Sequence, residues 1–359
     1  MPQSSTQASE PSSVDKVTSP ADGLQAKVAT SPTTTHSSLN ASLSPATRLK
    51  FRLQNTNELV VCPGVYDGLS ARIAMSVGFQ TMYMTGAGST ASKLGMAGLG
   101  IASRNDMVSN ADMIANLNPH HHELIADMDT GYGVPPLPPT KSPASLTGPI
   151  TVTQTVSQYI RANVAAFHIE DQVLTKRCGH LGGKRVVSND VYLSRIRAAR
   201  HAIDQAQSDI QLIARTDANQ QHGYDECMVR LKAARDLGAD VGLLEGFKSK
   251  EEARRCVEEL KPWPLLLNIV ENGHSPLITV EEAREMGFRI MIFSFAGLAP
   301  AYMAMKEAYE KLHEHGITGI QGSGVGPKTL FEVCGLQEAV ELDEAAGGED
   351  YKSNDLQKS

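Results

Sequence analysis

The sequence predicts an α/β fold, a (β/α)8 TIM barrel, from three observations. Eight short apolar runs have the composition of buried strands, and most are followed by segments with helical periodicity. Polar residues suited to chemistry stand at the carboxyl ends of these runs, where barrel enzymes build their sites. A doubly wound open sheet is the alternative. No GxGxxG motif follows the first strand, so a dinucleotide-binding domain is not expected.

The predicted strands are short, apolar and bounded by polar or turn-forming residues. They are Leu59–Val65, Thr81–Thr85, Glu123–Met128, Ala165–Glu170, Ile210–Thr216, Asp240–Glu245, Leu265–Val270 and Arg289–Phe293. In the predicted helices, charged residues and alanine recur at a spacing of three to four residues. These helices are Asp67–Val77, Val152–Asn163, Asp190–Ala206, Tyr224–Leu237, Lys250–Leu260, Val280–Met286 and Pro300–His313.

Capping residues support several of these helix boundaries. A glycine just past the last helical residue readily takes the left-handed conformation that ends a helix, and a Ser or Asp before the first turn accepts its free N–H groups. The predicted C-caps are Gly78, Gly238, Gly287 and Gly316, and the predicted N-caps are Asp67 and Ser249.

The ends of the chain differ in composition from its centre. Residues 1–44 are rich in Ser, Thr, Pro and Ala, and we expect them to be disordered because they bury too little apolar surface to offset the ordering entropy. We expect a catalytic barrel at 45–340 and a flexible acidic tail at 341–359. A proline-rich insertion at 134–147 interrupts the barrel, and four prolines in five residues favour an extended segment over a helix.

Charge and composition exclude several classes of partner. The net charge of −7 argues against a nucleic-acid surface, which needs a basic patch. No apolar stretch reaches the roughly 18–20 residues of a membrane span. The five cysteines show no CxxC spacing, which indicates reduced thiols and a cytoplasmic protein.

Two acidic pairs end predicted strands, Asp127-x-Asp129 and Glu170-Asp171. Carboxylates at neighbouring strand ends can hold a hard divalent cation through oxygen, so we expect a metal site there. An Asp-x-Asp pair at a strand end can also be a turn or a cap. The sequence Gly-Tyr-Gly at 131–133 favours the metal interpretation.

The run Lys-Arg-Cys-Gly-His at 176–180 follows the second acidic pair. Its cysteine, Cys178, lies between basic residues and beside Gly179, a setting suited to proton transfer or attack. Further strand ends carry Arg215, Glu245 and Asn268. Together these residues predict a metal-assisted reaction on a small anion, with Cys178 near its centre.

The order of these motifs resembles that of the isocitrate lyase/phosphoenolpyruvate mutase superfamily over roughly residues 45 to 340. The resemblance is carried by the sequences at 63–71 (PGVYDGLSA), 83–88 (YMTGAG), 127–133 (DMDTGYG), 168–172 (HIEDQ), 176–180 (KRCGH), 214–218 (ARTDA) and 268–271 (NIVE). It implies a barrel whose C-terminal helix is swapped between subunits, and a homotetramer built as a dimer of dimers. It also implies dependence on Mg²⁺ or Mn²⁺.

The resemblance further implies cleavage of a C–C bond in a small dicarboxylate. Ser275 resembles the serine that marks the branch hydrolysing oxaloacetate to oxalate and acetate, so we expect that reaction. A C–C bond lyase acting on 2,3-dimethylmalate or 2-methylisocitrate is the alternative enzyme. A catalytically silent interaction protein, with the proline-rich segment as the ligand of a partner domain, is the alternative from another class.

The residue roles follow from the same resemblance. The metal ligands are Asp127, Asp129 and Glu170, of which Asp127 binds directly and the others through water. The substrate-binding residues are Thr85, Gly86, Ala87, Gly179, Arg215, Asn268 and Ser275. Cys178 is the expected general acid, while Arg177, His180 and Glu245 tune its thiol and order a gating loop at 176–184. The chain departs from the family at Gly98, where members usually carry an Asp that helps to hold the water shell of the metal.

Overall fold

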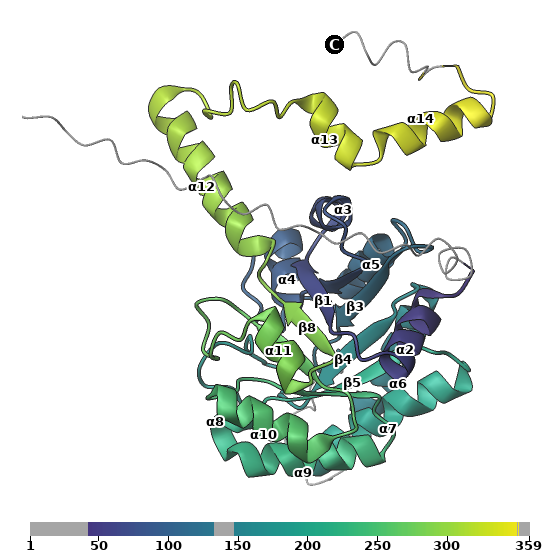
Figure 1. Cartoon of the computed structure of the whole chain (residues 1–359), viewed down its shortest axis with the longest axis vertical. Helices are drawn as coiled ribbons and strands as arrows, with labels where there is room; N and C mark the ends of the chain where they lie inside the picture. Colours follow the sequence, from purple (N-terminus) through teal and green to yellow (C-terminus); the bar gives the residue numbers. More distant parts are fainter. Residues whose placement is uncertain (1–41, 133–146, 350, 352–359) are drawn as a thin grey trace, which may run out of the picture. The chain divides into compact units, whose positions relative to one another are not determined.

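The computed structural model describes residues 42–132, 147–349 and 351. Eight parallel strands form one sheet in the order β6-β5-β4-β3-β2-β1-β8-β7, and a bridge between Gly242 and Leu265 brings β6 and β7 together, so the barrel is nearly closed. The helices lie outside the strands (Figure 1). The strands are β1 Val60–Val65, β2 Thr81–Met84, β3 Glu123–Asp127, β4 Ala166–Glu170, β5 Gln211–Thr216, β6 Val241–Leu244, β7 Leu266–Ile269 and β8 Ile290–Phe293. The predicted (β/α)8 barrel and all eight predicted strands are confirmed.

The helices of the described ranges include every helix predicted above. They are α2 Pro45–Asn55, α3 Gly68–Ser76, α4 Gly86–Leu94, α5 Arg104–Ala115, α6 Thr147–Arg161, α7 Asn189–Gln205, α8 Asn219–His222, α9 Tyr224–Asp236, α10 Lys250–Leu260, α11 Val280–Met286, α12 Leu298–His315, α13 Pro327–Val333 and α14 Leu336–Ala345. Six of these helices were not predicted from the sequence: α2, α4, α5, α8, α13 and α14. Residues 1–41 and most of the proline-rich insertion lie outside the described residues. Residues 341–345 of the expected acidic tail form the last part of α14.

The predicted caps lie where the sequence placed them. The carboxylate of Asp67 accepts the N–H of Ser70 at the start of α3, and Ser249 accepts the N–H of Glu252 in α10. The four predicted C-cap glycines all have positive φ, from 73° at Gly316 to 103° at Gly78. Cap geometry therefore fixes where these helices start and stop.

The inside of the barrel is filled by apolar side chains. Val60, Ile125, Ile213 and Ile290 from four strands belong to one buried cluster that also includes Leu49 of α2. Nearly every strand residue is buried, which explains why the strands read as continuous apolar runs instead of alternating ones.

Helix α2 is anchored to the amino-terminal end of β3. Arg48 and Arg52 of α2 form ion pairs with Glu123, the first residue of β3, at 3.3 and 2.8 Å. Glu123 is buried and also accepts a hydrogen bond from Thr81 at the start of β2. This anchoring leaves the opposite, carboxyl-terminal end of the strands for the chemistry.

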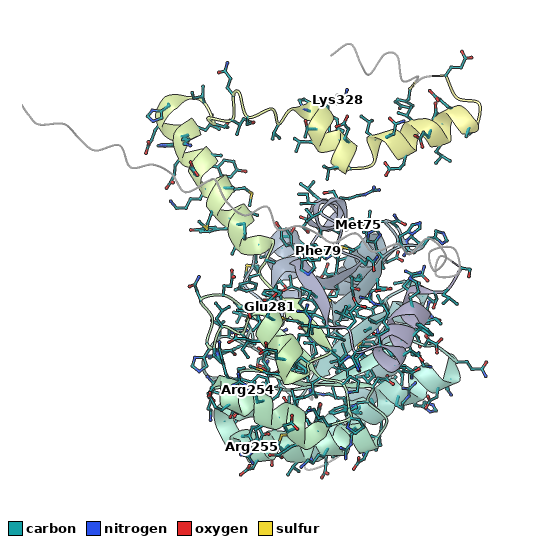
Figure 2. The ribbon with its side chains drawn as sticks, viewed as in Figure 1. Met75, Phe79, Arg254, Arg255, Glu281 and Lys328 are labelled. Atoms are coloured by element: carbon teal, nitrogen blue, oxygen red, sulfur yellow. The ribbon has the colours of Figure 1, made fainter. Side chains whose placement is uncertain are left out.

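Polar and apolar surfaces are distributed unevenly over the outer helices. Arg254 and Arg255 of α10 project into solvent, as charged residues on the outer face of a barrel helix normally do (Figure 2). Within the described part of the chain, α12 buries none of its side chains. No described helix is long and apolar enough to cross a membrane.

Candidate active site

The carboxyl-terminal ends of the strands meet around a small pocket with a cavity volume of about 30 Å³. The pocket is lined by Tyr83, Thr85, Ala87, Gly98, Asp127, Lys176, Cys178, Gly179, His180, Arg215, Asn268, Val270, Ser294 and Phe295. Residues predicted from five separate sequence motifs therefore share one pocket, because strand ends far apart in sequence are neighbours in a barrel.

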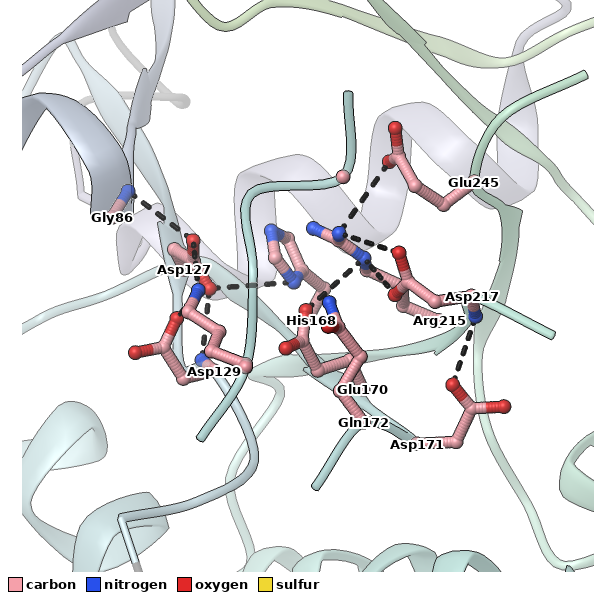
Figure 3. Close-up of polar contacts among 12 residues, drawn as sticks. Gly86, Asp127, Asp129, His168, Glu170, Asp171, Gln172, Arg215, Asp217 and Glu245 are labelled. Atoms are coloured by element: carbon pink, nitrogen blue, oxygen red, sulfur yellow. Dashed lines mark hydrogen bonds and ion pairs between the residues drawn. The ribbon is translucent and has the colours of Figure 1, made fainter. Parts of the chain in front are cut away.

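Asp127, the last residue of β3, is held by backbone donors. The N–H groups of Gly86 and Asp129 donate to its two carboxylate oxygens at 3.2 and 2.8 Å, and Nδ1 of His168 lies 3.7 Å away (Figure 3). Burial would raise the pKa of Asp127, but Lys176, His168 and Arg215, with the N–H of Asp129, together hold the pKa below its usual value. Asp127 is therefore an oriented, ionised carboxylate.

Lys176 lies between the two aspartates of the β3 motif. Its ammonium forms an ion pair with Asp129 and lies 3.9 Å from Asp127. Burial raises the pKa of Asp129 to about 6 even with Lys176 beside it. The ammonium of Lys176 therefore already lies where a cation would neutralise the two aspartates.

Glu170 is fully buried at the end of β4. Neither of its carboxylate oxygens has a hydrogen-bond partner among the described residues, and Nε of Arg215 lies 3.2 Å from one of them. Burial raises the pKa of Glu170 to about 8. A bound cation would stabilise a buried carboxylate whose oxygens accept no hydrogen bond.

These three carboxylates fit a hard divalent cation by the chemistry of their donor atoms, which are all oxygens. As placed, they do not enclose an ion, and in the described ranges no three His, Cys, Asp or Glu side chains do so. The ammonium of Lys176 stands beside Asp129 instead. Binding a metal there requires Lys176 to move away from that carboxylate.

Arg215, near the end of β5, faces several acidic groups. Asp217 accepts two hydrogen bonds from its guanidinium, at 2.8 and 3.0 Å, and Glu245 lies 3.9 Å from Nη2 (Figure 3). Glu245 in turn accepts hydrogen bonds from the side-chain amide of Asn268, and the hydroxyl of Ser294 donates to Asn268 at 2.6 Å. The arginine is thereby fixed as a donor fork aimed at the pocket.

The catalytic loop, defined here as residues 176–184, covers this group. A Cβ atom on Gly179 would lie 2.7 Å from the Glu245 side chain and 2.8 Å from Arg215, so the loop approaches as closely as it does only because glycine stands there. Cys178 lines the pocket, and burial raises the pKa of its thiol. The protonated thiol is the form that can donate a proton.

His180 links the loop to the turn after β7. The main-chain N–H of His274 donates to Nδ1 of His180, so the proton of the neutral ring is on Nε2, which lies 3.3 Å from Glu245. Burial lowers the pKa of His180, which favours this neutral ring.

Six predicted site residues do not line the pocket. Gly86, Asp129, Glu170 and Glu245 contact residues that do, whereas Arg177 and Ser275 lie farther out. Arg177 is exposed, and its side chain donates to the carbonyl of Gly182 within the loop, so it orders the loop without facing the pocket. Ser275 is half-buried and is not among the residues that line the pocket. Asp171, the second member of its acidic pair, is bound by Arg230, Thr216 and the N–H of Asp217.

The sequence reading gave no site role to Lys176, His168 or Tyr83. The hydroxyl of Tyr83 lies 2.8 Å from Nε2 of His168, whose Nδ1 faces Asp127. The sequence could have indicated Tyr83 and His168, because side chains two residues apart on a strand point to the same side. Tyr83 shares a face with Thr85, and His168 shares one with Glu170.

The chain is similar to known proteins over most of its length. Residues 49–313 match the phosphoenolpyruvate phosphomutase family. A solved structure of oxaloacetate acetylhydrolase in complex with the inhibitor 3,3-difluorooxalacetate is 62% identical, with a TM-score of 0.81, and covers 86% of this chain and 98% of its own. A 2,3-dimethylmalate lyase structure is 53% identical, with a TM-score of 0.81 and coverage of 87% and 98%.

Among characterised relatives, 2,3-dimethylmalate lyase of Eubacterium barkeri is 32% identical over 299 residues, which are 83% of this chain and 97% of the lyase. The family match and this relative both span most of the barrel that carries the pocket. The chain therefore belongs to the phosphoenolpyruvate phosphomutase family, within the phosphoenolpyruvate mutase/isocitrate lyase superfamily.

Proposed function

We propose that this protein hydrolyses the C2–C3 bond of oxaloacetate and releases oxalate and acetate. One observation carries the proposal: a protonated Cys178 lines the same small pocket as Arg215 and Asp127, in a chain 62% identical to an oxaloacetate acetylhydrolase. An anionic dicarboxylate needs a donor fork, and cleavage next to its carbonyl needs an acid for the departing carbon. The pocket holds both.

Substrate binding uses groups that the fold has already fixed. Nε and Nη2 of Arg215 each donate to Asp217, so one carboxylate of the substrate binds at the remaining N–H groups of the guanidinium. The other carboxylate lies towards Thr85, Gly86 and Ala87 at the start of α4, where main-chain amides favour an anion. Gly179 and Asn268 close the pocket around the substrate. Ser275 keeps its predicted role only if the turn that carries it moves inward when substrate binds.

The carboxylates Asp127, Asp129 and Glu170 would hold a divalent cation, Mg²⁺ or Mn²⁺. When bound, such an ion supplies a Lewis acid that polarises the substrate's oxygens and offsets the negative charge of the three carboxylates. The matched donor chemistry and the free oxygens of Glu170 support this assignment.

The reaction consumes one water molecule. Oxaloacetate takes up water at C2 to give the gem-diol, one hydroxyl proton is removed, and the C2–C3 bond breaks to leave oxalate and the enolate of acetate. The thiol of Cys178 then gives its proton to C3, and the thiolate is reprotonated by the proton released earlier. Burial raises the pKa of the thiol and so keeps Cys178 protonated until the enolate forms. The enolate carbon is a much stronger base than a thiolate, so the proton moves to carbon.

His180 and Glu245 position the loop that carries the acid. The neutral His180 ring accepts the N–H of His274 and faces Glu245, so it ties the loop to the turn after β7. A closed loop also excludes water from the enolate, which would otherwise compete as proton donor. Arg177 supports the loop from its solvent side.

A C–C bond lyase remains the second candidate, because 2,3-dimethylmalate lyases are also similar to this chain. The two reactions differ in products. Incubation of the purified protein with oxaloacetate and Mg²⁺ or Mn²⁺ should give oxalate and acetate in equal amounts. If it gives no oxalate but forms pyruvate from 2,3-dimethylmalate, the hydrolase proposal is wrong and the lyase replaces it.

We also propose that α12 docks on a second copy of the chain in a dimer of dimers. Tyr302, Met305, Tyr309 and Leu312 follow a spacing of three and four residues along α12, and each is between 46% and 65% exposed. An apolar stripe of this kind on a helix is normally covered by a partner. A cytoplasmic location is part of the same proposal, supported by five free thiols in the described part of the chain.

A further inference from the structure

Lys184, the last residue of the catalytic loop, has no role in the mechanism above, yet its side chain is only 3% exposed. Its ammonium donates to the carbonyl oxygen of Gly179 at 2.8 Å and to Asp217 at 2.9 Å. One contact joins the end of the loop to its middle, and the other joins the loop to the residue that holds Arg215. These two contacts fix the position of the buried ammonium of Lys184.

The single positive charge of Arg215 is outnumbered by the acidic groups around it, although it must also bind a substrate carboxylate. Three buried carboxyl groups lie within 4 Å of its guanidinium: Asp217 at 2.8 Å, Glu170 at 3.2 Å and Glu245 at 3.9 Å. Burial raises the pKa of Glu170 to about 8, so the negative charge comes from the other two. Asp217 alone occupies both Nε and Nη2. A substrate carboxylate is a further negative charge, and it binds only if some of the existing negative charge is neutralised by another group.

Lys184 supplies that second positive charge to Asp217. The two cations share one carboxylate, and although burial would raise the pKa of Asp217, Arg215 and Lys184 together hold it below its usual value. Without Lys184, the guanidinium of Arg215 would be the only positive group bound to Asp217 in the described structure. Its attraction for a second anion would then fall.

We propose that Lys184 is a positioning residue that couples the folded state of the catalytic loop to the affinity of Arg215 for a substrate carboxylate. The inference rests on the proposed function, because it takes Arg215 as the carboxylate-binding group. Lys184 contacts Asp217 and Gly179 at the same time. Its positive charge therefore lies beside Asp217 when the loop is folded over the pocket. By linkage, a bound carboxylate must stabilise the folded loop by the same factor.

The test measures binding and loop order in the full-length protein. Oxalate affinity is determined by calorimetry with Mg²⁺ present, and hydrogen exchange of residues 176–184 is followed with and without oxalate. Lys184→Gln keeps hydrogen-bonding capacity but removes the charge, and Lys184→Arg restores the charge. Lys248→Gln is the matched control, because Lys248 lines the cavity beside the loop but is exposed.

Lys184→Gln should bind oxalate about tenfold more weakly, the scale of a lost charge-assisted contact, and oxalate should no longer slow exchange in its loop. Lys184→Arg should recover most of both effects, and Lys248→Gln should match the wild type. Wild-type affinity in a folded Lys184→Gln variant overturns the inference. So does a wild-type loop whose exchange is unchanged by oxalate, a measurement that needs no variant. A wild-type protein that binds oxalate but releases none from oxaloacetate contradicts the proposed function and leaves this inference standing.

Discussion

At the scale of single residues, burial and neighbouring charges together decide which charge state each group has. The same loss of solvent raises the pKa of the Cys178 thiol and lowers the pKa of His180, so both are neutral near pH 7. Asp127 stays ionised because Lys176 stands beside it. The pocket therefore combines a neutral acid with fixed charges that can bind an anion.

Glu245 provides a test of this arrangement. Its carboxylate is 1% exposed, accepts the amide of Asn268 and faces His180. Glu245→Gln removes the charge and keeps the shape, so His180 and the loop lose their orientation. We expect kcat for oxalate release to fall by about 10²-fold, as for other small misplacements of catalytic groups, with an unchanged circular dichroism spectrum.

The matched control for this variant is Glu271→Gln, at an exposed position after β7. It should retain wild-type kcat. If Glu245→Gln is as active as this control, Glu245 does not position the loop.

Residue roles were only partly predictable from sequence. Asp127 and Arg215 were predicted because polar residues at strand ends stand out against apolar runs, and Cys178 was predicted because it lies between basic residues beside a glycine. Lys176 was overlooked because a lysine in a loop is usually solvated, and only the fold shows that it is buried between two aspartates. Ser275 was chosen by resemblance, and position in sequence does not determine whether a turn residue faces the pocket.

At the scale of elements, the strands were predictable because a closed parallel sheet is buried on both faces. Helix α4 was not, because its sequence GAGSTASKL contains small residues without an apolar stripe. Its packing depends instead on close approach to the barrel: a Cβ atom on Gly86 would lie 2.3 Å from the Asp127 carboxylate. Such tertiary contacts leave no periodicity in the sequence.

Close backbone approach also holds the barrel together at the pairing of β1 with β8. A Cβ atom on Gly64 of β1 would lie 2.4 Å from the main-chain oxygen of Ser294, just past β8. Because backbone cannot yield as a flexible side chain does, Gly64→Ala should lower the free energy of unfolding by about 1–3 kcal/mol.

Urea denaturation of the two proteins measures this loss. Gly148→Ala is the control, since a Cβ atom there meets no other atom within 4 Å, and alanine favours a helix. Equal stability of Gly64→Ala and the wild type would mean that the two strands separate easily at this point.

At the scale of the whole molecule, the apolar stripe on α12 is of a kind that monomeric proteins rarely leave exposed. Tyr309 lies in its middle and is 65% exposed. The mass in solution should be a multiple of the chain mass of 38.6 kDa, and Tyr309→Asp should shift it towards the single chain, because burying a lone carboxylate in an apolar interface costs several kcal/mol.

Light scattering during gel filtration measures both masses. Glu314→Gln, an exposed polar position on the same helix, should leave the mass unchanged. A wild-type protein that elutes at the mass of one chain would exclude the proposed docking of α12 on a second copy.

The central claim is that Cys178 delivers the proton to the carbon released by C2–C3 cleavage. The most direct measurement compares oxalate release from oxaloacetate by the wild type and by Cys178→Ser, with oxalate affinity determined for both. We expect Cys178→Ser to lower kcat by about 10²–10⁴-fold, the contribution of a general acid, while oxalate affinity stays within a few-fold. A Cys178→Ser protein that turns over oxaloacetate at the wild-type rate would contradict the claim.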